Sequence, residues 1–318
     1  MSKKMVRKDI EDTIFRRIIF IFPLFILCII GCMFLNLFIS SIPSLKKFGV
    51  SFLYTTTWDP VFEKFGALPF IFGTLITSCV ALLIAVPIGL GTAIYLAEYA
   101  PAAMRKIISI VVDLLAAIPS VIYGLWGIFV LVPVMRTHVQ PFLGKYLGFL
   151  PFFQGPNFGV GILSASVILA IMIAPFIISV SREVILAVPA VYKEAAYSMG
   201  ATRWEAVKTV ILSYGKGGII GGVILALGRA IGETMAVTMV IGNNAKISAS
   251  LFSPGYTLAS IIANEFSEAT TTLYTSSLIE IGLVLLLVSV VVNMLARILL
   301  WSIVAQASDG TSTAGSTI

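Results

Sequence analysis

The sequence contains few charged residues, and this scarcity excludes a water-soluble globular protein. Only 11% of its 318 residues are Asp, Glu, Lys or Arg, whereas 58% are hydrophobic. A soluble domain carries about 25% charged residues. One water-facing core cannot bury so much apolar surface, so the chain must use lipid as its solvent.

Residues and motifs that carry catalysis are also scarce. His138 is the single histidine, in a stretch expected to be a solvated loop. Cys28, Cys32 and Cys79 lie in apolar runs and show neither a disulfide framework nor metal-ligand spacing. No G-x-x-x-x-G-K-[ST] loop, H-E-x-x-H or G-x-S-x-G occurs. We therefore predict a chain that is not an enzyme and holds no metal or cofactor of its own.

Long hydrophobic runs are what the sequence has in abundance. A membrane-crossing helix needs about 20 apolar residues, and we place spans near 17–41, 68–97, 107–135, 159–181, 217–242 and 275–303. The first run is too long for a signal peptide, and no A-x-A cleavage site follows it. Pro119 predicts a kink in the third. The sequence thus predicts an all-α polytopic membrane protein with a segment 1–16, a transmembrane domain 17–303 and a disordered tail 304–318.

Lys and Arg are distributed unequally between the two sides of this arrangement. One side holds 14 of them, in the N-terminal segment, at Arg105 and Lys106, in 182–216 and at Arg297. The other side holds 6, in the loops 42–67, 136–158 and 243–274. The positive-inside rule places both termini in the cytoplasm. The net charge of +6 does not indicate nucleic acid binding, because the basic residues cluster between apolar spans.

The segment 189–215 is predicted to be a compact helical unit. Thr202 and Glu205 have the spacing of a capping box, and the glycine at 200 interrupts the helical pattern before them. This pattern predicts a short helix, a glycine turn and a second helix with an apolar face. By composition alone, that face fits a lipid surface and a protein partner equally well.

The letters "EAAYSMG" in this segment resemble the EAA loop of ABC importer permeases. Glu194, Ala195, Ala196 and Gly200 match the family pattern, whereas Ser213 stands in place of its usual proline. In that family the loop forms a coupling helix that sits in a cleft of the ATPase subunit. The resemblance therefore implies that the four matching residues shape an ATPase docking surface.

Three further stretches resemble phosphate importer permeases of the PstC type: "IYLAEYAP" (94–101), "AAIPSVIYGLWGIFVLVP" (116–133) and "GRAIGETMAVTMVIGN" (228–243). The resemblance implies a type I ABC importer permease fold in the plasma (inner) membrane. It also implies a second permease of the PstA type, two PstB-type ATPases that bind ATP and Mg, and an extracytoplasmic phosphate-binding protein. Another oxyanion, such as molybdate or sulfate, is the nearest alternative cargo. A stand-alone secondary anion transporter is the alternative class.

Two charged residues lie inside the fifth run. Arg229 and Glu233 are four residues apart, which predicts one helical face with the two groups within reach. A fixed guanidinium matches phosphate oxygens in a bidentate manner. Glu233 would neutralise the arginine without cargo, or accept a hydrogen bond from protonated phosphate. The alternative is an ion pair that holds this span against its neighbours. Asp113 and Glu280 are weaker candidates for the pathway.

Overall fold

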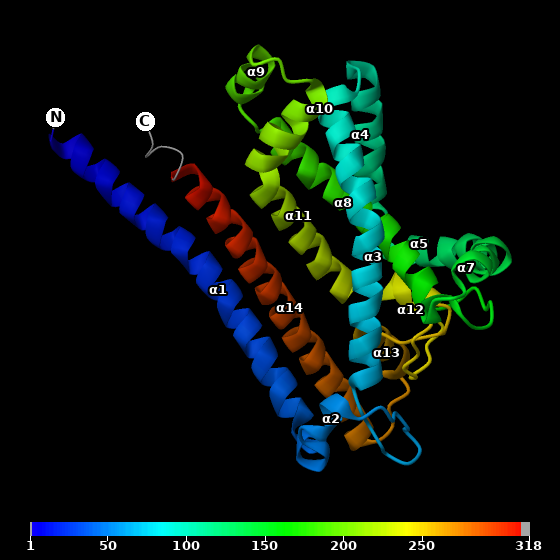
Figure 1. The fold of residues 1–318 in the computed structure, drawn as a ribbon. Helices are drawn as coiled ribbons and strands as arrows, with labels where there is room; N and C mark the ends of the chain where they lie inside the picture. Colours follow the sequence, from blue (N-terminus) through cyan, green and yellow to red (C-terminus); the bar gives the residue numbers. More distant parts are fainter. Residues whose placement is uncertain (1, 313–318) are drawn as a thin grey trace.

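The computed structural model describes the backbone of residues 2–312 and the side chains of residues 15 and 17–302. These residues form a nearly all-helical molecule (Figure 1). Six helical stretches are long and apolar enough to cross a bilayer: Arg17–Phe48, Leu68–Tyr99, Ser120–Leu147, Ile162–Leu186, Arg203–Gly232 and Thr272–Ser302. The prediction of an all-α protein with six spans is confirmed.

The centre of the bundle is α8 (Ile162–Leu186), which packs on α3 (Leu68–Ile94), α4 (Ala102–Ala117) and α11 (Leu212–Gly232). Its sequence is apolar on all sides, as expected of a helix surrounded by protein. Of its most hydrophobic window, 72% is buried inside this single chain, more than in any other span. The helix α8 is therefore the core around which the other spans are arranged.

The first helix, α1 (Ser2–Phe48), lies at the periphery beside α14 (Thr272–Ser312), as Figure 1 shows. Its most hydrophobic window is not buried by the rest of the chain. The two helices are joined near one end, where the Ser44 and Ser277 hydroxyl oxygens lie 3.0 Å apart. Residues 304–312 continue α14, although a disordered tail was expected there, and 313–318 lie outside the described residues.

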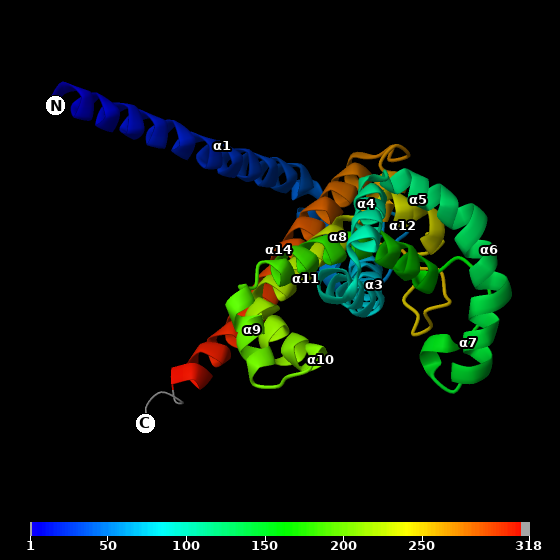
Figure 2. The same ribbon diagram turned by 90° about the horizontal axis from the view of Figure 1, so that it is seen from above.

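The third expected span is not one helix over 107–135. It is broken at Ile118 and Pro119, both in extended conformation, because proline disfavours a helical conformation in the residue before it. The chain continues through α5 (Ser120–Trp126), α6 (Val132–Val134) and α7 (Gln140–Leu147), joined by the π-helical turns Gly127–Leu131 and Met135–Val139. Figure 2 shows this part as a curved arm at the side of the bundle.

The fifth expected span, 217–242, is also interrupted. The helix begins as α10 (Arg203–Ala206), continues through a π-helical turn (Val207–Ile211) into α11, and ends at Gly232. Glu233 is extended, with φ −68° and ψ 129°, and α12 (Met235–Ile241) follows it. No proline causes this break; glycine and a β-branched threonine on either side of Glu233 weaken the helix.

The two ends of the bundle carry different short elements (Figure 1). One end, here the α9 end, carries α9 (Ala190–Ser198), α10 and a π-helical turn, Tyr95–Tyr99, that extends α3. The opposite end, here the α2 end, carries α2 (Ser51–Tyr54) and α13 (Leu258–Glu265). Glu265 ties that end together, because its Oε2 accepts hydrogen bonds from Trp58 Nε1 at 2.7 Å and from the Tyr274 hydroxyl at 2.6 Å.

Candidate functional site

The helices that follow the two breaks pack directly on each other. In α5, a Cβ added at Gly124 would lie 2.4 Å from Met239 Sδ and 3.2 Å from Ala236 Cα, so α5 and α12 approach at a distance that only glycine permits. Membrane proteins tolerate interrupted helices where protein or a water-filled cavity satisfies the freed backbone groups, and such interruptions mark binding sites. The paired breaks therefore indicate the candidate site.

A hydrogen bond stabilises the first break. The hydroxyl of Tyr123, in α5, donates to the carbonyl oxygen of Leu115, in α4, at 2.8 Å. This carbonyl belongs to the last turn of α4, where it also accepts a hydrogen bond from the Ile118 backbone N–H at 3.3 Å. Tyr123 thus fixes the angle between α4 and α5, which no sequence signal indicated.

Arg229 lies in the last turn of α11 and is exposed. Among the side chains that the structure describes, its guanidinium forms no ion pair and no hydrogen bond. Glu233 is partly buried, and its Oε1 accepts a hydrogen bond from the Ala236 backbone N–H at 3.3 Å. The expectation that the two share one helical face as a pair is wrong, because the helix ends between them. Neither residue forms an ion pair with another described side chain, so the alternative of a packing ion pair finds no support in this part of the chain.

The second break also carries hydroxyl groups that the sequence pattern did not single out. Thr234 and Thr238 are partly buried, with Thr238 Oγ1 donating to the Thr234 carbonyl at 2.6 Å. Asn243, just after α12, has a positive φ of 49° and donates from Nδ2 to the Thr238 carbonyl at 3.1 Å. The sequence signal that could have indicated these groups is the recurrence of polar residues through an otherwise apolar segment.

Asp113 and Glu280 do not join this site through any hydrogen bond or ion pair among the described side chains. Asp113 is exposed on α4. Glu280 is buried in α14, which packs on α1 and α13, and its Oε2 has no hydrogen-bond partner. A pathway role for either residue remains a prediction.

The segment at the α9 end has the predicted form. Gly200 turns the chain with φ +85°, and Thr202 and Glu205 form a complete capping box at the start of α10. Glu194, Ala195 and Gly200 are exposed, whereas Ala196 is buried. Three of the four expected docking residues are thus on the surface, and the fourth is buried.

An ion pair that the sequence did not reveal connects α9 to the body of the bundle. Lys193 Nζ lies 2.5 Å from Oε1 of Glu98, which belongs to the π-helical extension of α3. Beside this pair is a cavity of about 480 Å³, whose lining includes Glu98, Tyr197 and Arg203. A second contact joins α9 to α11, where the rings of Tyr192 and Tyr214 have their centroids 5.5 Å apart.

Comparisons with known proteins agree with this architecture. The family model for the inner membrane component of binding-protein-dependent transport systems matches residues 85–301. A phosphate transport system permease protein PstC from Mesorhizobium japonicum is 48% identical, with 94% of this chain and 93% of the relative covered. One from Haemophilus influenzae is also 48% identical, with 94% and 96% covered. A probable PstC from Methanocaldococcus jannaschii is 40% identical, with 92% and 94% covered.

Two solved structures share the fold. A chain of a bacterial alginate ABC transporter has a TM-score of 0.60 at 16% identity, with 91% of this chain and 94% of that chain covered. A chain of the inward-facing MetNI methionine ABC transporter has a TM-score of 0.55 at 19% identity, with 74% and 94% covered. At such identities the likeness concerns the fold, that of type I ABC importer permeases, and not the cargo. The chain belongs to the family of inner membrane components of binding-protein-dependent transport systems, in the group of PstC permeases.

Proposed function

We propose that this chain is a permease subunit of an ATP-driven phosphate importer, and that phosphate passes the end of α11 at Arg229. The observation that carries the proposal is the exposed guanidinium of Arg229, which lies beside the break before α12 and has no ion-pair partner among the described side chains. The residue lies about 20 Å along the helix axis from Lys216, at 1.5 Å per residue. An anion that has lost its hydration water at that depth needs a fixed hydrogen-bond donor. A guanidinium meets this need because it donates two parallel hydrogen bonds to two oxygens of one phosphate. The names of the relatives support the choice of phosphate.

We propose that Glu233 selects a protonated anion. Its carboxylate has no cationic partner among the described side chains, and one oxygen accepts a single backbone hydrogen bond. The remaining acceptor capacity suits the O–H of hydrogen phosphate. Sulfate near neutral pH offers no such proton, so a carboxylate at this position would repel it.

The complex we propose around this chain is the one that its resemblance to PstC-type permeases implies. With no phosphate-binding loop in its sequence, ATP and Mg belong to two separate ATPase subunits of the PstB type, docked on Glu194, Ala195, Ala196 and Gly200. A second permease of the PstA type completes the pathway, and a phosphate-binding protein delivers cargo at the α2 end. In this arrangement the α9 end and both termini are cytoplasmic, in the plasma or inner membrane. The phosphate pathway between the two permeases opens alternately to the two sides of the membrane.

The test is uptake of labelled phosphate by vesicles that contain the complete importer. Arg229→Gln should abolish uptake while the ATPase still co-purifies, because glutamine retains hydrogen bonding but not the fixed charge. Arg17→Gln, at an exposed arginine of the peripheral α1, is the matched control and should transport normally. Glu233→Gln should lower the preference for phosphate over sulfate.

The double variant Arg229→Met, Glu233→Leu should assemble and transport no phosphate. Normal uptake by that variant would overturn the pathway assignment. Preferential uptake of sulfate or molybdate by the unmodified complex would favour the alternative cargo. Phosphate transport by this chain without any ATPase would favour a secondary transporter.

A further inference from the structure

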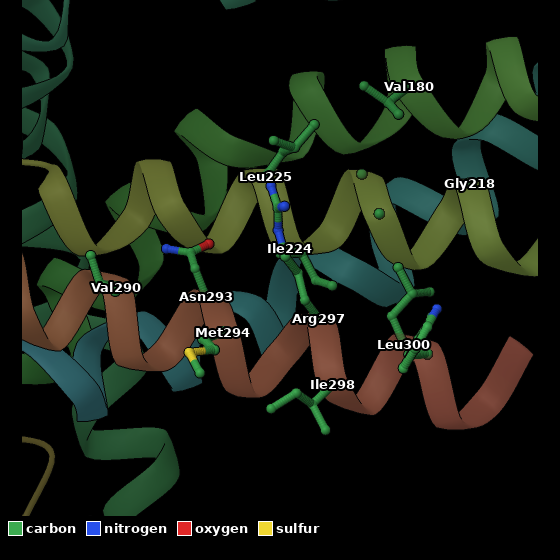
Figure 3. Close-up of a pocket in the computed structure, with 13 residues that line it drawn as sticks. Val180, Gly218, Ile224, Leu225, Val290, Asn293, Met294, Arg297, Ile298 and Leu300 are labelled. Atoms are coloured by element: carbon green, nitrogen blue, oxygen red, sulfur yellow. The ribbon is translucent and has the colours of Figure 1, made fainter. Parts of the chain in front are cut away.

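A groove of about 970 Å³ lies between α11 and α14 (Figure 3), in the half of the bundle nearer the α9 end (Figure 1). Val180 of α8 contributes to its lining. Most lining residues are glycines or apolar side chains, and among them Arg297 is the only charged one and no carboxylate occurs. The groove is therefore an apolar channel with a single fixed cation.

Glycines in α11 create the open space. At Gly218 and Gly222 a Cβ would lie 2.7 Å from side-chain atoms of Val184 and Val180, so α11 sits close on α8. At Gly221 nothing lies within 4 Å of the Cβ position, so this face of α11 is open. Near the other limit of the groove, Gly228 approaches Asn293, with 3.4 Å from the Cβ position to Oδ1. The groove thus extends along α14 from this contact toward Trp301.

The cation of the groove, Arg297, has no partner among the side chains that the structure describes. Arg297 is exposed, and among the described side chains it forms no ion pair or hydrogen bond. Figure 3 shows its side chain reaching from α14 across the groove toward Leu225 of α11. An arginine that only marks the membrane boundary would extend along its own helix to water. Here the guanidinium is aimed at the space between two helices.

The depth of Arg297 matches a lipid headgroup. It lies 25 residues beyond Thr272, or about 38 Å along α14, compared with a hydrocarbon thickness of about 30 Å. Trp301, which also lines the groove, is 82% exposed one turn further on, as in the aromatic belts at membrane interfaces. The groove therefore leads from the interface at the α9 end into the hydrocarbon.

We propose that this groove binds one anionic phospholipid, with its phosphate on Arg297 and one acyl chain lying along Gly221 between α11 and α14. A positive guanidinium next to an apolar channel complements both parts of such a lipid, and basic pockets between membrane helices bind anionic headgroups. A helix from another protein would need a carboxylate to meet Arg297. The bound lipid supports α11, whose far end carries Arg229, against α14.

The test uses the complete importer in phosphatidylcholine nanodiscs with or without phosphatidylglycerol. Native mass spectrometry should show phosphatidylglycerol retained by the complex, and Arg297→Gln should weaken retention by about tenfold, the loss expected for a charge-assisted hydrogen bond. Arg17→Gln, which removes an exposed arginine on α1, should not change it. Gly221→Leu keeps the charge and fills the open space, so it should also displace the lipid.

Brominated lipids give a second measurement that does not depend on transport. Brominated phosphatidylglycerol should quench tryptophan fluorescence more than brominated phosphatidylcholine does, and Trp301→Phe should remove the difference. Equal retention in Arg297→Gln and the unmodified complex would overturn the proposal. So would equal quenching by the two lipids, or no quenching by either, which would show that protein covers the groove. If Gly221→Leu impairs assembly, the arginine variants and the quenching measurement still decide whether the groove binds the anionic phospholipid.

Discussion

Removing the carboxylate of Glu98 should loosen α9 from the bundle. Glu98 and Lys193 join the π-helical extension of α3 to α9 at an N···O distance of 2.5 Å. Their side chains are only 12% and 20% exposed, so little water screens the pair. In Glu98→Gln the lysine keeps its charge but loses its partner in a mostly buried place. The remaining contacts of α9, including the tilted ring contact of Tyr192 with Tyr214, do not replace that charge.

The magnitude follows from the burial. Breaking a fully buried pair by removing one partner costs about 3–5 kcal/mol, whereas an exposed pair contributes about 0–1 kcal/mol. This pair lies between the two limits, and we take about 2 kcal/mol for the docked position of α9. At 1.4 kcal/mol per factor of ten, the undocked population of α9 rises by about 30-fold.

Hydrogen exchange of the α9 amides measures this population directly, and it should accelerate by about 30-fold in Glu98→Gln. In the complete importer, more ATP should be hydrolysed per phosphate transported, because α9 no longer moves with α3. The charge exchange Glu98→Lys with Lys193→Glu should restore much of the coupling. The matched control is Lys47→Gln, which breaks a pair that is 46% and 41% exposed. Equal hydrogen-exchange rates of the α9 amides in Glu98→Gln and Lys47→Gln would refute the reasoning.

Three further predictions concern the glycines and the cap. Gly200→Val should impair ATPase recruitment, whereas Gly200→Asn should have a small effect on it; co-purification of the ATPase measures this. At Gly200 φ is +85° and no atom lies within 4 Å of the Cβ position, so a substitution acts through backbone strain alone, and asparagine tolerates this conformation better than valine. Thr202→Ala should destabilise the start of α10 by about 1 kcal/mol, seen as faster amide exchange at Glu205. Gly73→Ala should reduce the yield of folded complex, since its Cβ would lie 2.1 Å from a backbone carbonyl oxygen, whereas Gly91→Ala, with open space, should not.

The properties that the sequence predicted correctly depend on local pattern. Apolar runs long enough for a bilayer predicted six spans, because length and hydropathy are local quantities. The capping box at Thr202 and the glycine turn at 200 also formed as expected, since each involves residues within four positions of one another. Pro119 predicted the place where the third span changes direction but not the size of the change.

The features that the sequence did not reveal depend on contacts between distant segments. The rule that residues four apart meet holds only in an unbroken helix, and nothing near Glu233 requires a break as a proline would. The break accompanies the packing of α12 on α5 at Gly124, more than a hundred residues earlier in the chain. Lys193 and Glu98 are separated by 95 residues. No periodicity relates such positions, so only the folded chain shows that they meet.

The pairing of the first helix with the last has a consequence for synthesis in the membrane. Ser44 and Ser277 are 233 residues apart, which at 5–20 residues per second corresponds to roughly 10–50 s of translation. Throughout that interval α1 has inserted while α14, the long helix on which it packs, has not been made. The nascent protein therefore holds an isolated apolar helix in the bilayer until α14 has been synthesised. During this time α1 can form non-native contacts with other membrane helices. A partner subunit or an insertion factor that shields α1 during this wait would raise the fraction of chains that mature.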